Sequence, residues 1–205
     1  MLSLTLASSA FASKWAGVEP TSYGAGVRSD IYTPSSSLSG IPSGTTVKAA
    51  VWIRDQETDD WAPNAGWLIR PGTYNDPKSY YVYTDTAGGE YPEYLSTQSY
   101  GVSRAYEIYY DPVSHPGKRW SIKVVGTWRH HMYMYTASYN RSMGGGKTSA
   151  NNANLWSHLT TVQYKTTGGS YTNFPSSSTT YNDSPLLIDI NYSKYDFDVY
   201  NDNYW

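Results

Sequence analysis

Apolar and polar residues alternate with a period of two along several short stretches of the chain, which is typical of β-strands with one buried face. The clearest case is segment 47–54, where Val47, Ala49, Val51 and Ile53 share one face. Similar alternation runs through segments 26–32, 104–110, 120–128, 160–165, 186–192 and 195–200. No useful length of sequence follows the 3.6-residue period of an amphipathic helix. The pattern predicts an all-β protein.

The segments between these stretches are rich in Gly, Pro, Ser, Thr and Asn, which favour turns and loops. Loops are expected at 34–44, at 87–93, from the glycine run at 144–146 to residue 154, and at 168–184, with a possible helical turn at 155–158. About ten strands, with no detectable internal repeat, favour an antiparallel two-sheet β-sandwich of the jelly-roll or concanavalin A-like type over a propeller or solenoid.

The composition is unusually rich in tyrosine and tryptophan, whose aromatic rings carry a hydrogen-bonding group. It has 205 residues with 22 Tyr, 8 Trp and only 3 Phe, so much of its apolar surface also offers a hydrogen-bonding group. One sandwich domain, residues 13–205, accommodates this length. The net charge of −2 provides no basic field for a phosphate backbone, so we expect no nucleic-acid partner.

The first twelve residues read as the remnant of a secretory signal. Met1 to Ala12 is an apolar run that ends in Ala10-Phe11-Ala12, a pattern of small residues typical of a cleavage site. We therefore expect a secreted, extracellular protein, with a short buried strand as the alternative interpretation of this run.

No other segment approaches the roughly 20 apolar residues of a membrane span. The chain has no cysteine, which excludes disulfides and thiolate metal sites.

One local motif resembles a known family. The segment Asn64-Ala65-Gly66-Trp67, followed by Pro71, Tyr74 and a Tyr-Tyr-Val-Tyr strand, is similar to the core of neprosin-like proteins. These belong with the glutamic peptidases, whose fold is a concanavalin-like sandwich. In that group the residue before Ala-Gly-Trp is a catalytic glutamate. Here that position is Asn64.

The resemblance also implies a second catalytic carboxylate in the C-terminal half, but no glutamate follows Glu107. The segment 136–140 aligns best with that position, and its plausible stand-ins are Ser138 and Asn140. A neutral amide hydrogen-bonds a carbonyl or a water but does not accept and return a proton near neutral pH. We therefore expect a peptidase-like fold without peptidase chemistry.

A hydrolase remains the alternative. Composition and length resemble the small jelly-roll xylanases, and Glu107 lies in a Tyr-rich strand as their nucleophile does. Those enzymes need a second, late carboxylate, for which only an aspartate such as Asp189, Asp196 or Asp198 is available. If the chain is an enzyme, Glu107 is the candidate catalytic residue.

No motif for a cofactor or metal emerges, and we expect neither. His130 and His131 are adjacent, so they point to opposite faces of a strand and do not share one metal. A hydrogen-bonded role is favoured for His158. Asp196 and Asp198 share a strand face and are a weak calcium candidate.

Rows of rings at two-residue spacing suggest a ligand groove. Tyrosines on one sheet face can stack a sugar ring or grip an extended peptide, although they also stabilise a sheet as cross-strand pairs. The predicted groove contains Asn64, Trp67, Tyr81, Tyr83, Glu107, Tyr133, Tyr135, Ser138 and Asn140. The resulting hypothesis is a secreted non-catalytic protein that binds glycan or peptide, or that associates with itself at the cell surface. A structural subunit of a filament or surface layer is a further alternative.

Overall fold

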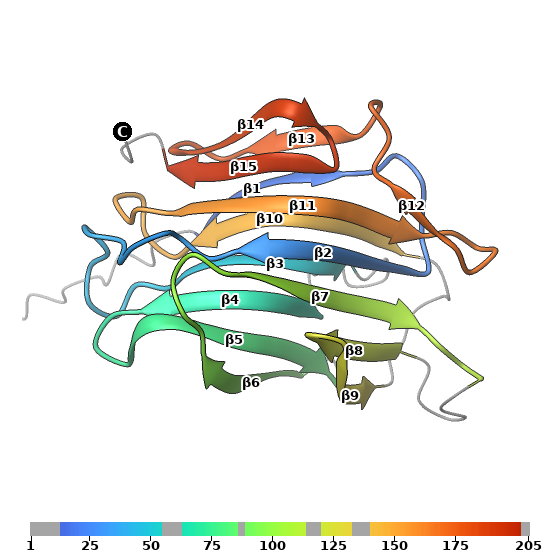
Figure 1. Ribbon diagram of the computed structural model, residues 1–205, viewed down its shortest axis with the longest axis horizontal. Helices are drawn as coiled ribbons and strands as arrows, with labels where there is room; N and C mark the ends of the chain where they lie inside the picture. The colour runs from blue at the N-terminus through green and yellow to red at the C-terminus, as the bar shows by residue number, and fades with distance from the viewer. Residues whose placement is uncertain (1–12, 55–62, 86–88, 114–119, 133–139, 202–205) are drawn as a thin grey trace, which may run out of the picture.

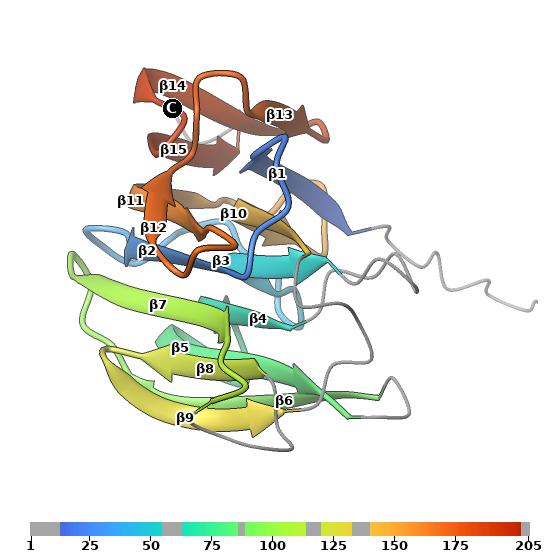
Figure 2. The same cartoon turned by 90° about the vertical axis from the view of Figure 1, so that its right-hand side faces the viewer.

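The computed structural model describes residues 13–54, 63–85, 89–113, 120–132 and 140–201, and its regular elements are all β-strands. The strands form two antiparallel sheets that pack face to face (Figures 1 and 2). The predicted antiparallel β-sandwich is therefore confirmed. In these residues no helix is long and apolar enough to cross a membrane.

The seven-stranded sheet contains the first strand of the described chain in its interior. Its order is β13 (Thr179–Asn182), β1 (Lys14–Glu19), β10 (Arg141–Thr148), β3 (Val47–Arg54), β4 (Asn64–Arg70), β5 (Tyr74–Thr84) and β6 (Glu90–Thr97). Because β1 pairs with both β10 and β13, residues from the two ends of the chain meet in one sheet.

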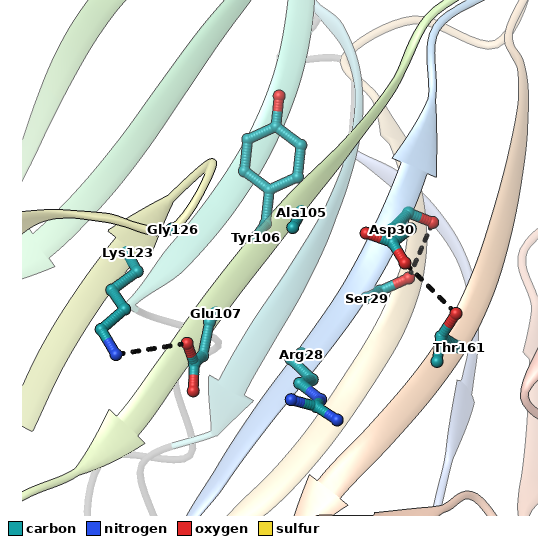
Figure 3. A pocket seen from close by; sticks show the side chains of 9 residues that line it. All are labelled: Arg28, Ser29, Asp30, Ala105, Tyr106, Glu107, Lys123, Gly126 and Thr161. Atoms are coloured by element: carbon teal, nitrogen blue, oxygen red, sulfur yellow. Dashed lines mark hydrogen bonds and ion pairs between the residues drawn. The ribbon is translucent and has the colours of Figure 1, made fainter.

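The eight-stranded sheet covers the other side of the core. Its order is β14 (Leu186–Ser193), β15 (Asp196–Asn201), β11 (Trp156–Lys165), β2 (Gly26–Tyr32), β7 (Ser103–Tyr110), β8 (Trp120–Val124) and β9 (Thr127–Met132), and β12 (Tyr171–Asn173) pairs with β11. In β2, Val27 and Ile31 point into the core, whereas Arg28 lies on the outer face with Glu107 and Lys123 (Figure 3).

Segment 120–128 is two strands, not the single strand that its alternation predicts. Val125 and Gly126 form the turn between β8 and β9, with φ angles of 54° and 70°. Positive φ at both central residues is the geometry of a two-residue type I′ hairpin turn. The prediction was wrong here because valine is a strand residue and a poor signal for such a turn.

The glycine run at 144–146 lies inside β10 and not in the predicted loop. A Cβ atom on Gly145 would lie 2.1 Å from the carbonyl oxygen of Ala16 in β1, and one on Gly146 would lie 2.6 Å from Leu155 Cδ2 in the core. Glycine is needed because neighbouring backbones and the opposite sheet approach β10 too closely for any side chain. The three glycines therefore indicate a closely packed strand and not a turn.

Three other predicted irregular segments also contain strands. Residues 90–97 form the edge strand β6, whose Pro92 is tolerated because an edge strand leaves one side of its backbone unpaired. The stretch 168–184 contains β12 and β13, and β11 begins at Trp156, inside the predicted helical turn. These strands are mostly polar on both faces, so the alternation of apolar and polar residues that marks a half-buried strand is weak in them.

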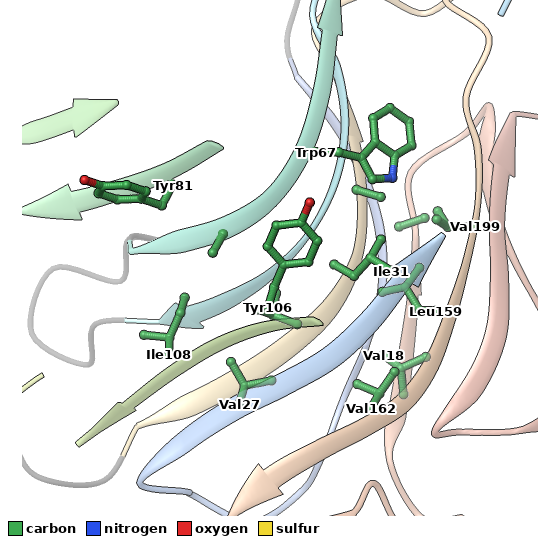
Figure 4. Packing of buried hydrophobic residues seen from close by; sticks show 14 of the residues in the cluster. Val18, Val27, Ile31, Trp67, Tyr81, Tyr106, Ile108, Leu159, Val162 and Val199 are labelled. Atoms are coloured by element: carbon green, nitrogen blue, oxygen red, sulfur yellow. The ribbon is translucent and has the colours of Figure 1, made fainter. Parts of the chain in front are cut away.

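The core lies between the inner faces of the sheets (Figure 4). Val18, Val27, Ile31, Leu159 and Val199 are all fully buried there. Trp67 of β4 is also fully buried. Its indole N–H donates to the Tyr32 carbonyl at 3.2 Å and to Ser157 Oγ at 3.3 Å, both in the opposite sheet. This side chain therefore joins the two layers by packing and by hydrogen bonds.

We expect Trp67→Phe to lower the free energy of unfolding by about 1–3 kcal/mol, because it removes a buried donor and leaves unfilled volume. Urea denaturation followed by circular dichroism measures the loss. Trp128→Phe is the matched control, since Trp128 is 49% exposed. An equal loss in the two variants would contradict the assigned role of Trp67.

Candidate functional site: the outer face of the seven-stranded sheet

A row of small residues crosses the middle of the outer face of the seven-stranded sheet. Gly17 pairs with Gly145, Gly145 with Ala50, and Ala50 with Gly66, which pairs with Tyr80. Directly paired residues of antiparallel strands lie on the same face. The centre of this face therefore carries small side chains, and it is buried, with Ala50 0% exposed.

Lys48 and Asn64 meet beside this row. The two residues are on neighbouring strands and are offset by four residues, because Asn64 pairs with Trp52 whereas Lys48 pairs with Leu68. Lys48 Nζ nevertheless donates to Asn64 Oδ1 at 3.3 Å, so the lysine stem runs along its strand toward the amide. The absence of a large side chain at Ala50 and Gly66 leaves room for this stem.

The Lys48 ammonium has little solvation. Its Nζ lies 5.2 Å from the centre of the Tyr80 ring and 5.9 Å from that of Trp52. Burial, reinforced by the positive charge of Lys147, lowers the pKa of Lys48 to about 7, although Glu90 opposes the shift. Amines with such values act as bases at neutral pH. Within the described residues, the indole N–H of Trp52 and the Tyr80 hydroxyl are buried polar groups without a hydrogen-bond partner.

A cavity of about 320 Å³ opens on the same face, on the side of β1 and β13. We call it the Glu19 cavity. It is lined by Trp15, Glu19, Arg54, Met143, Tyr181 and Asp183. Glu19 follows Val18, which pairs with Gly144, so Glu19 lies beside Met143 in the next strand. Two carboxyl groups, those of Glu19 and Asp183, thus line one cavity.

Glu19 is buried and paired with an arginine. Its side chain is 1% exposed and contacts Arg141 Nε. Arg141 also donates from Nη2 to the Tyr181 hydroxyl at 3.3 Å. Burial raises the pKa of Glu19 above its ordinary 4.5, against the opposing effects of Arg141, Tyr181 and Arg54. A carboxyl group in such surroundings can hold and release a proton in mildly acidic solution.

The sequence reasoning missed Glu19 because it missed the strand that carries it. The segment Lys14–Glu19 does alternate, with Ala16 and Val18 facing the core and Trp15, Gly17 and Glu19 facing outward. This signal lies beside the apolar run at 1–12, which itself resembles a secretory signal. The resemblance implies a second acid late in the chain. In the structure an acid from the start of the chain is on this face, because β1, which carries Glu19, pairs with β10.

The predicted groove around Asn64 is divided between two faces of the sheet. Asn64 is on the outer face, whereas Trp67 and Tyr81 belong to the core between the sheets. Tyr83 also packs against the core, with its ring 3.8 Å from that of His130 in β9. Asn64 and Trp67 are three residues apart and therefore point in opposite directions. The grouping of these residues in one groove was wrong.

The other predicted site residues lie elsewhere. Glu107 is on the outer face of the eight-stranded sheet (Figure 3), on the far side of the core from Asn64. Asn140 is fully buried, and its backbone N–H donates to the Gly24 carbonyl at 2.9 Å. Tyr133, Tyr135 and Ser138 lie outside the described residues.

The histidine and aspartates considered for metal binding contact one another. His158 Nδ1 lies 2.8 Å from Asp198 Oδ1, and His158 Nε2 lies 3.1 Å from Asp196 Oδ1. The hydrogen-bonded role predicted for His158 is confirmed. Among the described residues, no group of three or more His, Cys, Asp or Glu side chains is arranged to hold a metal ion.

Comparison with known proteins identifies the fold. No protein-family model matches the chain, and no curated protein sequence matches it. Solved structures do match. A crystal structure of scytalido-glutamic peptidase with a peptide-based transition-state analogue is 13% identical, with a TM-score of 0.61 over 93% of this chain and 98% of that one. The chain has the glutamic-peptidase fold.

A second neighbour has the same fold. SCP-B, a member of the eqolisin family of peptidases solved with the tripeptide Ala-Ile-His, is 14% identical, with a TM-score of 0.57 over 92% of this chain and 97% of that one. The fold expected from Asn-Ala-Gly-Trp and its flanks is therefore confirmed. At these identities the likeness establishes the fold alone.

The pKa of Lys48 predicts a specific pH dependence of stability. Below pH 7 both the folded and the unfolded chain bind the lysine proton, and the folded state bears the full penalty of a desolvated charge. From about pH 7 to 10.5 only the unfolded chain binds it. Stability therefore rises with pH in this window, with a slope of up to about 1.4 kcal/mol per pH unit from this group.

Urea titrations of wild type and Lys48→Met between pH 6 and 9 test this prediction. The wild type should gain stability relative to the variant as the pH rises. Lys78→Met is the matched control, because Lys78 is on the same face but lies over the Tyr74 ring at 4.8 Å. Parallel curves for wild type and Lys48→Met would contradict the shifted pKa.

Proposed function

We propose that this protein is a hydrolase that binds an extended polypeptide across the outer face of its seven-stranded sheet and cleaves it at the Glu19 cavity. The observation that carries the proposal is the buried Glu19 carboxyl group, with its raised pKa, in a cavity of about 320 Å³ on that face. The structural neighbours support it, because they are peptidases solved with a peptide-based inhibitor and with a tripeptide.

Glu19 and Asn64 lie on the same face of the sheet. Met143 of β10 and Trp52 of β3 separate Glu19 from Asn64, which amounts to three strand spacings, or about 14 Å. An extended peptide of four or five residues covers that distance. The residues that line the Glu19 cavity are the ones that contact this peptide, because Asn64 and the row from Gly17 to Gly66 are buried.

In the proposed reaction Glu19 acts as the general base. A water oxygen attacks the carbonyl carbon of the scissile bond, and the water proton passes to the Glu19 carboxylate. The same proton then passes to the leaving nitrogen as the C–N bond breaks. The guanidinium groups of Arg54 and Arg141 provide positive charge near the carbonyl oxygen as it becomes anionic.

Hydrolysis of fluorescently labelled casein tests this function. Glu19→Gln should reduce the rate by about 100-fold or more, because it removes a proton-transfer group. The wild-type rate should rise with pH through the pKa of Glu19, that is, above pH 4.5. Glu107→Gln should retain the wild-type rate, since Glu107 is on the other sheet.

Full activity in Glu19→Gln, or no hydrolysis by wild type between pH 3 and 8, would refute the catalytic proposal. Circular dichroism and urea titration of each variant show whether it is folded. A folded Glu19→Gln protein with lost activity supports the assigned role.

Binding without cleavage is the second candidate, and Asn64 favours it. This amide occupies the position where the resemblance places a catalytic glutamate, and its oxygen already accepts from Lys48. The same labelled casein measures this outcome by fluorescence anisotropy, with Asn64→Ala as the variant expected to bind more weakly. Assembly through the β6 edge has less support, because this edge strand carries Glu90, Pro92 and Glu93, which discourage edge pairing.

A further inference from the structure

The outer face of the eight-stranded sheet has a second cavity, of about 290 Å³ (Figure 3). It lies on the other sheet from Glu19. We call it the Arg28 pocket. It is lined by Arg28, Ser29, Asp30, Ala105, Tyr106, Glu107, Lys123, Gly126 and Thr161. None of these residues takes part in the proposed hydrolysis.

Polar side chains of the pocket continue in a straight row across five strands. Gln163 pairs with Arg28, Arg28 with Glu107, Glu107 with Lys123, and Lys123 with Trp128. These residues therefore share one face. The row alternates cation and anion and ends at the flat ring of Trp128, which is 49% exposed.

The charged groups of the row are held in place by neighbours. Tyr171, from the short strand β12, donates from its hydroxyl to Glu107 Oε1 at 2.5 Å. The Arg28 guanidinium lies 4.1 Å above the Tyr171 ring, and its Nε donates to Gln163 Oε1 at 2.7 Å. Lys123 Nζ lies 3.8 Å from Glu107 Oε2. Such positioning lowers the entropy lost when a ligand binds.

Atoms that face the pocket retain capacity for hydrogen bonds. Within the described part of the chain, Arg28 forms side-chain hydrogen bonds through Nε only, which leaves its two Nη groups as donors. Asp30 accepts from Thr161 Oγ1 through Oδ2, which leaves Oδ1 as an acceptor. A carboxylate and a guanidinium at one pocket are suited to pairs of neighbouring hydroxyl groups, because each offers two parallel hydrogen-bonding atoms.

Backbone strain occurs at two edges of the pocket. In the described residues only Val125 and Thr161 are non-glycine residues with positive φ, and both angles are 54°. Thr161 lines the pocket, and Val125 adjoins the lining residue Gly126. Such conformations are costly for β-branched side chains and concentrate at functional sites. At Thr161 the irregularity between Thr160 and Gln163 places the hydroxyl against Asp30.

We infer that the Arg28 pocket binds a neutral sugar unit of a polysaccharide, with Trp128 stacking against a further unit of the same chain. Arg28 and Lys123 balance Asp30 and Glu107 in charge, so the pocket provides no field that selects an anion or a cation. Its volume suits one small polar ligand. An exposed ring at the end of a polar row suits the apolar face of a sugar. This inference does not depend on the proposed hydrolysis.

Affinity electrophoresis in native gels that contain oat β-glucan, xylan or galactomannan tests the inference, with polygalacturonate as the charged comparison. At least one neutral polysaccharide should retard the wild-type protein. Glu107→Gln and Arg28→Lys should raise the apparent dissociation constant by about tenfold or more, because each removes charge-assisted or bidentate hydrogen bonds. Trp128→Ala should weaken the same retardation.

Glu19→Gln and Lys78→Met, both on the other sheet, are the matched controls and should be retarded like wild type. The inference is overturned if no neutral polysaccharide retards the protein, or if only polygalacturonate does. Equal retardation of wild type, Glu107→Gln and Arg28→Lys would also overturn it. Casein binding that is lost in Glu107→Gln would assign the pocket to peptide and refute the sugar.

Discussion

The close approach of neighbouring backbones, between β10 and β1 and between β4 and β3, is the constraint on which the outer face of the seven-stranded sheet depends. A Cβ atom on Gly145 would lie 2.1 Å from the Ala16 carbonyl oxygen, and one on Gly66 would lie 2.0 Å from that of Ala49. Glycine at these positions keeps the centre of the face low. Glycine at position 66 leaves room for the Lys48 stem to extend to Asn64. Glycine at position 145 allows β1, which carries Glu19, to pair closely with β10.

The period-two pattern predicted the fold because burial acts on alternate residues of a strand. It assigned the inner face of Val47–Arg54 correctly, as it did Val27 and Ile31 in β2. It failed at the glycine run of β10, where close packing removes the side chains that make a strand recognisable. It also failed at Val125. Valine favours β-strands, but here it occupies the turn between β8 and β9, where φ is positive.

The candidate site was harder to predict because its members come from strands that are distant in sequence. Asn64 was found through a local motif, and its partner Lys48 lies on the neighbouring strand, 16 residues earlier in the chain. Glu19 reaches the face only through the pairing of β1 with β10, which local pattern cannot foresee. The spacing of Asn64 and Trp67 does predict that they are on different faces of the sheet, because side chains three residues apart on a strand point in opposite directions.

Desolvation dominates the electrostatics of Glu19 and Lys48, two of the ionisable groups on this face. It raises the pKa of Glu19 despite Arg141 and Arg54, and it lowers the pKa of Lys48 despite Glu90. An acid and an amine that are shifted in opposite directions both move toward their neutral forms. The environment between Glu19 and Lys48 is therefore weakly polar and buried. In the reaction that we propose, proton transfer at Glu19 takes place where the fixed guanidinium charges act strongly on the reacting carbonyl.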